Sequence, residues 1–390
     1  MREKSRDCST KAAELAPLRI AISTGGGDAP GLNAVIRAVV LSAYQRGWET
    51  FGISRGYDGL FLPEKPSGPE RRKEDALAGL IPLGPSDVRG ITHLGGTILG
   101  TTTRGNPFQW LSTRSDGTMC EIDRSDDLVS AFRAHRLDAL VAIGGDGSLR
   151  IAYELFRKGI PVVGVPKTID NDVAGTESSF GFDTAVSTAT DALDKIHTTA
   201  ESHDRVFVVE LMGRYAGWIA LHSGLSGSAD VILIPEIPFD IAKVSNKILE
   251  REQRGRRFSI VVAAEGARPK GGQMVYREPA GPGRPERLGG IAEEVAKEVT
   301  ARTGKETRSV VLGHLQRGGS PTTFDRLLAL RFGSAAVRAI GEEEFGCCVV
   351  YTPPTVGRVP LSEIIGKTKL VPLDSGIIMT ARNIGISLGD

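Results

Sequence analysis

Two segments of the chain each join an apolar run to a glycine-rich turn and then to a helical pattern, and no other feature restricts the possible folds as strongly. The run 139–143 leads into Gly-Gly-Asp-Gly-Ser at 144–148, and the run that begins at residue 18 leads into the glycine-rich turn 23–33. A strand that passes through glycines into a helix directs backbone N–H groups and the positive end of the helix dipole at one point. Neither turn is a Walker A loop, because no Gly-Lys-Ser/Thr follows, yet two such turns favour polyphosphate binding over simple tight turns.

Each turn also contains an aspartate, and Asp146 in the turn 144–148 indicates that a metal ion accompanies the phosphate. A carboxylate repels a bare phosphate, so we expect Asp146 to hold Mg²⁺ that a nucleotide polyphosphate shares. The sequence therefore predicts a phosphoryl-transfer enzyme.

Apolar runs alternate with amphipathic helical patterns along the rest of the chain. The helix after the first turn is expected to place its apolar residues from Leu32 to Ala43 on one stripe and to end near Gly47. Further strands are expected at 162–165, 206–211, 231–234, 259–264 and 309–312. This alternation predicts an α/β fold with mainly parallel sheets, and 390 residues are enough for two domains. The stretch 265–290 has no sustained period, so we expect a long surface loop or flap.

The composition argues against two classes of partner. Lys and Arg number 48 against 47 Asp and Glu, which leaves a net charge of +1 and no basic field that would favour nucleic acid. No apolar run approaches the roughly 18 residues that a membrane span requires. Residues 1–17 are charged, which favours a loose N-terminal tail over a signal peptide. The four cysteines lack metal-ligand spacing, as is typical of reduced thiols, and we expect a cytoplasmic protein.

Two carboxylates follow the expected strand 162–165 in the segment Pro-Lys-Thr-Ile-Asp-Asn-Asp at 166–172. Open α/β sheets bind ligands at the carboxyl ends of their strands. One of Asp170 and Asp172 can accept a proton from an attacking hydroxyl while the other helps to hold the metal. A polar turn with Asx capping is the alternative interpretation of this segment taken alone.

Two further segments at strand ends offer arginine, the side chain that best matches phosphate geometry. They are 210–218, which contains Arg214, and 313–321, which contains His314 and Arg317. A lone arginine is usually solvated, and a lone histidine is more often structural than a ligand.

Arg205 and Arg308 are placed differently, because each lies at the amino end of a strand whose carboxyl end carries one of these segments. Six residues at about 3.3 Å each separate the two ends by roughly 20 Å, which exceeds the reach of an arginine. If these two arginines bind substrate, we expect them to serve the site of a neighbouring subunit; otherwise they are surface charges.

Six segments taken together resemble a known family. GGGDAPGLN, GGTILG, GGDGS, PKTIDND, MGRYAGW and GHLQRGGSP occur in the order and spacing of the 6-phosphofructokinases, from about Leu18 to the C-terminus. The resemblance implies Mg²⁺-dependent phosphorylation of D-fructose 6-phosphate at its 1-hydroxyl by ATP, which gives the fructose 1,6-bisphosphate of glycolysis. NAD kinases and diacylglycerol kinases share the Gly-Gly-Asp-Gly turn, but PKTIDND and GHLQRGGSP argue against both.

The resemblance also implies a role for each matching residue. Asp170 becomes the base for the sugar 1-hydroxyl, and Asp146 and Asp172 manage Mg²⁺. Arg214 and Arg104 would stabilise the transferring phosphoryl group, and the implied catalytic group also includes Gly27 and Thr168. The implied donor site consists of Gly27, Tyr57, Arg104, Asp146, Gly147 and Ser148. Fructose 6-phosphate would be surrounded by Thr168, Asp170, Met212, Gly213, Arg214, Glu236, His314 and Arg317, with Arg205 and Arg308 from a neighbouring subunit.

Two α/β domains are expected to face each other across a cleft. The donor domain would hold residues 18–181 and 316–360, and the sugar-phosphate domain would hold 182–315 and 361–390. The shared site implies a homo-oligomer, for which both a dimer and a tetramer remain open.

Two residues give conflicting signals about the phosphoryl donor. ATP-using members of the family typically have glycine where this chain has Gly147, whereas pyrophosphate users have a second aspartate there. Lys167, however, resembles the pyrophosphate users. An aspartate at position 147 would place bulk and negative charge where the α-phosphate passes, whereas a flexible Lys167 can swing aside, so we expect ATP. Pyrophosphate-dependent phosphotransfer is the alternative.

The effector site of the family is less complete here. Arg37, Asp230, Arg254, Arg256 and Arg257 are still available for it. Leu41 and His197 replace arginines of the allosteric bacterial enzymes, so we expect a weak or altered allosteric response. A non-catalytic regulatory paralogue is the alternative from another class, although the residues whose loss would indicate it are all present: Asp146, Asp170, Asp172 and Arg214.

Overall fold

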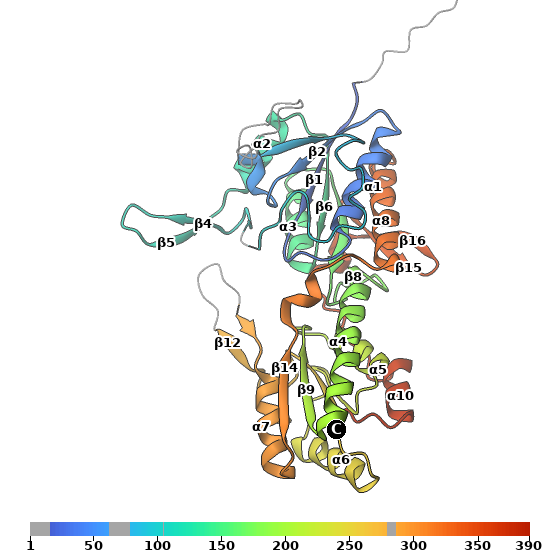
Figure 1. Cartoon of the computed structure of the whole chain (residues 1–390). Helices are drawn as coiled ribbons and strands as arrows, with labels where there is room; N and C mark the ends of the chain where they lie inside the picture. The colour runs from blue at the N-terminus through green and yellow to red at the C-terminus, as the bar shows by residue number, and fades with distance from the viewer. Residues whose placement is uncertain (1–15, 62–78, 104, 279–285) are drawn as a thin grey trace, which may run out of the picture.

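Two parallel α/β sheets organise the chain, as the alternating pattern predicts (Figure 1). The computed structural model describes residues 16–61, 79–103, 105–278 and 286–390. The expected tail 1–17 therefore lies outside the described residues except for its last two. No helix of the described part is long and apolar enough to cross a bilayer.

The larger sheet has the strand order β16-β15-β7-β6-β1-β2-β3, with β8 paired to β7. Its five central strands are mutually parallel, and only the two edge strands β3 and β16 run antiparallel to their neighbours. The strands are β1 (Arg19–Thr24), β2 (Glu49–Ile53), β3 (Leu80–Leu83), β6 (Ala139–Gly144), β7 (Val162–Thr168), β8 (Phe180–Gly181), β15 (Cys347–Thr352) and β16 (Thr355–Pro360).

Helices cover both faces of this sheet. α1 (Leu32–Tyr44) and α8 (Thr323–Gly341) pack on one face, and α2 (Ser125–Ala134) and α3 (Asp146–Arg157) pack on the other. The apolar stripe of α1 is buried as expected. Gly31 precedes this helix at φ 105°, a left-handed conformation, and a Cβ there would come within 2.7 Å of Phe180.

The smaller sheet has four parallel strands in the order β10-β11-β9-β14. They are β9 (Val206–Leu211), β10 (Val231–Leu233), β11 (Ser259–Ala264) and β14 (Thr307–Val311). One face packs against α4 (Phe182–His203), α5 (Trp218–Ser226) and α10 (Gly376–Asn383). The other packs against α6 (Ile241–Gln253) and α7 (Ile291–Thr303).

The final segment returns to the smaller domain later than the expected residue 361. Leu361 and Ile364 of α9 (Leu361–Ile364) belong to the core of the larger domain, where α9 packs against α3 and β16. The C-terminal residues in the core of the smaller domain begin at Val371. The boundary moves because these two apolar side chains fit beside α3.

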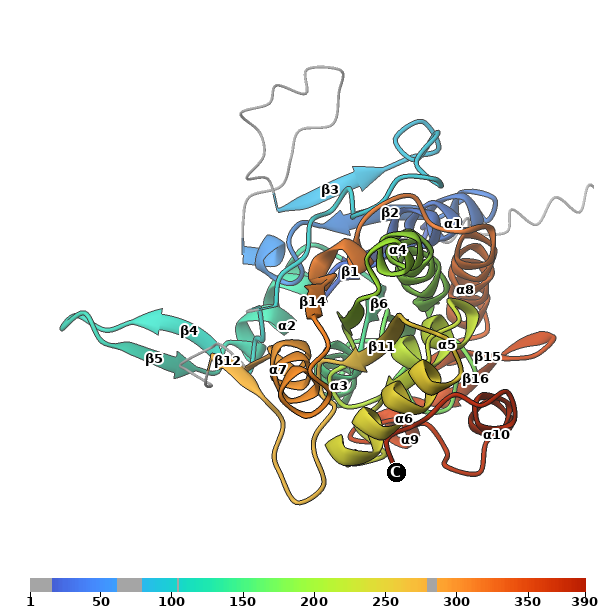
Figure 2. The ribbon, with the colours of Figure 1, turned by 60° about the horizontal axis from the view of Figure 1, so that its bottom comes forward.

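Two hairpins lie outside the sheets, and the sequence analysis expected neither. β4 (Trp110–Thr113) and β5 (Met119–Ile122) form an arm that projects from the larger domain, on the same side of the molecule as β12 (Figure 2). β12 (Tyr276–Glu278) and β13 (Arg287–Leu288) lie within 265–290, so the expected surface loop or flap contains a short antiparallel pair that was not expected. Strands of three and two residues are too short to show a period of two in the sequence.

Candidate active site

The two glycine-rich turns lie directly against each other at the carboxyl ends of β1 and β6. Gly25 donates its backbone N–H to the carbonyl of Ile143 at 2.9 Å. A Cβ on Gly25 would come within 2.7 Å of the Ser148 hydroxyl, and one on Gly144 within 2.2 Å of the Ser148 Cβ. The glycines therefore permit a close approach that no side chain would allow.

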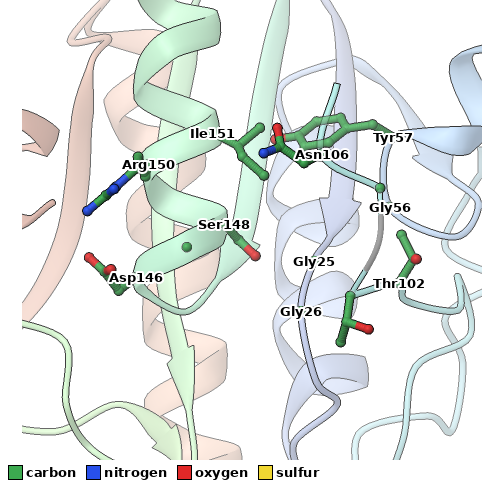
Figure 3. Close-up of a pocket in the computed structure, with 13 residues that line it drawn as sticks. Gly25, Gly26, Gly56, Tyr57, Thr102, Asn106, Asp146, Ser148, Arg150 and Ile151 are labelled. Atoms are coloured by element: carbon green, nitrogen blue, oxygen red, sulfur yellow. The ribbon is translucent and has the colours of Figure 1, made fainter. Parts of the chain in front are cut away.

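A cavity of about 440 Å³ opens beside these turns (Figure 3). Its lining brings together most residues that the sequence analysis placed in a donor site, including Tyr57, Asp146, Gly147 and Ser148. A Cβ on Gly147 would meet nothing within 4 Å, so this backbone position faces open space. Of the two other expected donor-site residues, Gly27 lines the neighbouring cavity described next, and Arg104 lies outside the described residues.

A second cavity, of about 600 Å³, adjoins the first, because Gly26, Thr102 and Thr103 line both. Its other lining residues are Gly27, Asp28, Thr101, His314 and Arg317. Arg317 donates to the carbonyl of Asp28 at 3.1 Å. The turn of the larger domain and the segment 313–317 that follows β14 thus meet across this cavity.

Asp170 lies where the two domains meet, in the turn after β7. Its Oδ1 is shielded from solvent and has no hydrogen-bond partner among the described residues. Burial and the neighbouring Asp172 raise the pKa of Asp170 to about 6, against the opposing charges of Arg317, Lys167 and Arg214. A carboxylate with an unused oxygen and a raised pKa is suited to accept a proton.

Asp172 and Asp146 form a second carboxylate pair beside Asp170. Burial raises the pKa of Asp172, the nearby Asp146 raises it further, and the hydroxyl of Thr168 opposes the shift. The described residues contain no group of three or more His, Cys, Asp or Glu side chains that could hold a metal ion. Mg²⁺, however, is usually held by one or two carboxylates together with substrate phosphates and water. The pair Asp146 and Asp172 therefore fits such an ion bound jointly with a polyphosphate.

Lys167 is fixed in place, and the expectation that it could swing aside is wrong. Its side chain is buried, and Nζ donates to the carbonyls of Gly25, at 3.0 Å, and of Gly27. Burial, and next the charge of Arg317, lower the pKa of Lys167 to about 7. Lys167, near the end of β7, thus connects the glycine-rich turn 23–33 to the strand that leads into the turn with Asp170.

The smaller domain contributes Met212, Gly213 and Arg214 from the segment after β9. Met212 packs against the core of this domain, and Gly213 has a φ of 132°. A Cβ on Gly213 would come within 2.9 Å of the carbonyl oxygen of Ala216. Arg214 is near enough to Asp170 to lower its pKa, and it forms an ion pair with Glu286 at 2.7 Å.

One acidic residue of the site was missed, and another was misplaced. Glu265 follows β11, and burial and the charge of Asp170 raise its pKa to about 7 while Arg317 opposes the shift. Glu236, which the sequence analysis assigned to the sugar phosphate, lies elsewhere. Its carboxylate accepts from the N–H groups of Gly217 and Val371, and it lines a different cavity with Lys243 and Lys270. Glu236 was assigned through the family resemblance alone, and in the structure its carboxylate supports the backbone.

Lys369 also comes close to the site, although no motif indicated it. Nζ donates to Asn171 Oδ1, at 2.9 Å, and to the carbonyls of Thr176 and Glu177. Asn171 is held at a φ of 52° between Asp170 and Asp172. Lys369 therefore supports the turn that carries both carboxylates.

Arg205 and Arg308 lie side by side at the amino edge of the smaller sheet. Glu306 pairs with Arg205 at 2.9 Å and also with Arg308. Each arginine is at the opposite end of its strand from Met212 or His314, as the sequence analysis expected.

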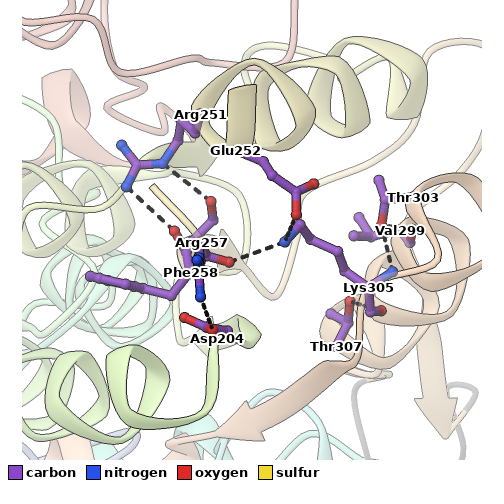
Figure 4. Close-up of polar contacts among 10 residues, drawn as sticks. Asp204, Arg251, Glu252, Arg257, Phe258, Val299, Thr303, Lys305 and Thr307 are labelled. Atoms are coloured by element: carbon purple, nitrogen blue, oxygen red, sulfur yellow. Dashed lines mark hydrogen bonds and ion pairs between the residues drawn. The ribbon is translucent and has the colours of Figure 1, made fainter. Parts of the chain in front are cut away.

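Four of the five residues considered for an effector site have side-chain partners among the described residues, and for Arg37 this partner is the Val88 carbonyl at 2.8 Å. Arg257 pairs with Asp204 at 3.4 Å, Arg254 with Glu250 at 2.6 Å, and Asp230 with Arg251 at 2.7 Å. Figure 4 shows how Lys305 joins this region by donating to the Arg257 carbonyl and pairing with Glu252. His197 contacts the Gly227 carbonyl at 2.8 Å.

Comparison with known proteins gives matches along nearly the whole chain. A family model described as phosphofructokinase matches residues 19–340. The ATP-dependent 6-phosphofructokinase of Chloroflexus aurantiacus is 49% identical over 372 residues, which are 95% of this chain and 98% of that protein. The pyrophosphate–fructose 6-phosphate 1-phosphotransferase of Amycolatopsis mediterranei is 46% identical over 360 residues, 92% and 97% of the two chains. The crystal structure of Pichia pastoris phosphofructokinase in the T-state has a TM-score of 0.71 at 33% identity, and covers 90% of this chain and 35% of that one.

Proposed function

The chain belongs to the phosphofructokinase family, and we propose that it transfers the terminal phosphoryl group of ATP to the 1-hydroxyl of fructose 6-phosphate. The observation that carries this proposal is the buried Oδ1 of Asp170, which has no hydrogen-bond partner among the described residues and feels the charges of Arg317 and Arg214. The cavity lined by the two glycine turns supplies the phosphate cradle. A proton acceptor between a phosphate cradle and an anion-binding group is the arrangement that phosphoryl transfer to a hydroxyl needs.

Each part of the site has one task in this reaction. Asp170 accepts the proton of the 1-hydroxyl, and Arg317 and Arg214 offset the negative charge that gathers around it. Thr168 orients the turn by accepting from the Asp170 N–H at 3.1 Å. When bound by Asp146 and Asp172, Mg²⁺ would neutralise charge on the donor phosphates.

ATP is the donor in this proposal, with Gly147 as its main structural support. The two relatives named above use different donors, so family membership alone does not choose between them. Gly147 lines the donor cavity and leaves open space there, which suits a bulky nucleotide. A carboxylate at that position would point into the same space and repel the α-phosphate.

The sugar phosphate is proposed to lie in the second cavity, against His314 and Arg317, with Glu265 nearby. Arg205 and Arg308 complete this site from a neighbouring subunit, which makes the functional protein a homo-oligomer. The support is their location at the far edge of the sheet, where their own site is out of reach.

A coupled assay tests the proposal directly. The chain is supplied with fructose 6-phosphate, Mg²⁺ and either ATP or pyrophosphate, and formation of fructose 1,6-bisphosphate is followed. We expect turnover with ATP and much less with pyrophosphate. Preference for pyrophosphate would contradict the donor assignment, and no turnover with either would favour a non-catalytic regulatory paralogue.

A further inference from the structure

Arg214 is held by a carboxylate that comes from outside the catalytic segments. Its Nη2 donates to Glu286 Oε1 at 2.7 Å, and the hydroxyl of Tyr215 donates to the same oxygen at 3.2 Å. The hydrogen bond and the charge of Arg214 lower the pKa of Glu286, so this carboxylate is ionised at neutral pH. One anion therefore already occupies the guanidinium edge of Arg214.

The fold imposes this contact through a shared anchor. Glu210, in β9, is buried and accepts hydrogen bonds from the N–H groups of Gly290 and Ala292, which follow the β12–β13 hairpin. Arg214 follows the same strand β9. The base of the hairpin and the segment that contains Arg214 are thus both attached to β9. Because Glu286 directly precedes β13 of this hairpin, the shared attachment holds Glu286 next to Arg214.

The guanidinium is only partly satisfied by this partner. Nε of Arg214 is shielded from solvent and has no partner among the described residues. A phosphoryl group can take Nε and a terminal nitrogen together, because the planar donor fork matches two phosphate oxygens. Glu286 holds one of the nitrogens that such a bidentate contact requires.

The local charge makes a further anion costly. Besides burial, the charge of Asp172 raises the pKa of Asp170, and the charge of Asp170 raises the pKa of Glu265, so several carboxylates already lie close together here. A donor phosphate that arrives while Glu286 stays bound meets an arginine whose charge is already neutralised.

We propose that Glu286 competes with the transferring phosphoryl group for Arg214, and that the carboxylate must leave the guanidinium before transfer. This inference rests on the proposed function, because it assigns Arg214 to that group. Glu286 is then a regulating residue of the hairpin rather than a catalytic one: it lowers the effective affinity of the site for the donor.

The test compares the parent enzyme with Glu286→Gln, which keeps the size of the side chain and removes its charge. Exposed ion pairs contribute modestly, so we expect a rise in kcat/KM for ATP of about 2- to 5-fold, through a lower KM with little change in kcat. Inorganic phosphate, titrated by calorimetry, should bind the variant more tightly by a similar factor. Tyr215→Phe removes one hydrogen bond to Glu286 and should shift both values less, in the same direction.

Glu293→Gln is the matched control, since it removes an exposed carboxylate in the first turn of α7 and should leave both readouts unchanged. An unchanged or lower kcat/KM together with unchanged phosphate affinity in Glu286→Gln would overturn the proposal. Failure of the proposed function is distinguishable, because then the parent itself turns over neither donor while the phosphate titration still decides whether Glu286 competes for the anion.

Discussion

Single residues at this site are tuned by burial and by the charges around them. Asp170 and Asp172 are both pushed toward the protonated state, while Lys167 is pushed toward the neutral state. The three pKa shifts have the same main cause, because burial removes each group from water and disfavours its charged form. The motif Pro-Lys-Thr-Ile-Asp-Asn-Asp was sufficient to select these residues, but the shift of Asp170 also depends on neighbours that are distant in sequence, Arg317 and, from the other domain, Arg214.

Replacement of Asp170 tests its role as the proton acceptor. Asp170→Asn should lower kcat by roughly 10² to 10⁴ while fructose 6-phosphate still binds, as is usual for loss of a positioned base. In the parent, the base must be ionised, so kcat/KM should be constant above pH 6 and fall as the pH drops through about 6, the pKa of Asp170. A pH profile and a binding titration check both points. Near-normal turnover, or an acid limb close to the ordinary value of 3.8, would remove Asp170 from this role.

Gly147 is the residue on which donor choice is expected to depend. Gly147→Asp should fold normally, because a Cβ there meets nothing within 4 Å. Its carboxylate should strongly depress kcat/KM with ATP, through bulk and charge repulsion at short range. The same assay with pyrophosphate shows whether the variant gains that donor. Gly147→Ala is the control for bulk without charge, and unaltered ATP kinetics in Gly147→Asp would show that this glycine does not select the donor.

At the scale of elements, the apolar strands of the two sheets were easier to predict than the two hairpins. The strands 206–211 and 259–264 were expected with the bounds that β9 and β11 have, because each is a mainly apolar run between polar turns. The hairpins β4–β5 and β12–β13 were missed, since strands of two to four residues show no period. Glu265 and Glu286 were missed for a related reason: their closeness to Asp170 and Arg214 arises only from tertiary packing.

The junction between α4 and α8 gives a prediction about stability. Thr184, at the start of α4, donates its hydroxyl to Asp325 of α8 at 2.6 Å and accepts from the N–H of Thr322 at 3.0 Å. Thr184→Val keeps the shape but removes both of these hydrogen bonds, and it leaves the Thr322 N–H without this acceptor while Asp325 still accepts from the residue-184 N–H. The loss should cost about 1–3 kcal/mol. Urea unfolding measures the loss. Thr198→Val, an exposed site on the same helix, should change stability by less than about 0.5 kcal/mol. Equal midpoints for the two variants would contradict the role of this junction.

The whole molecule presents Arg214 and the peripheral arginines Arg205 and Arg308 at opposite edges of one sheet. Arg214 follows the carboxyl end of β9, whereas Arg205 precedes its amino end and shares Glu306 with Arg308. Family membership was predictable from six motifs and is confirmed by the matches along the chain. A site shared between subunits stays a prediction, and it rests on reach alone, because a strand of six residues separates its ends by roughly 20 Å.

Mixed oligomers test whether the active site is shared between subunits. Arg205→Ala leaves a subunit with an intact Asp170, and Asp170→Asn leaves a subunit with an intact Arg205, so each variant alone should be nearly inactive. In a two-fold dimer, one of the two sites in a mixed pair combines the intact Asp170 with the intact Arg205. Random pairing at equal amounts makes half of the dimers mixed, so about a quarter of the parent activity should return. The measurement is steady-state turnover after the variants are unfolded and refolded together, with differently tagged subunits to verify mixing. Activity no greater than the sum of the two separate variants, in verified mixed oligomers, would mean that Arg205 acts within its own subunit or not at all.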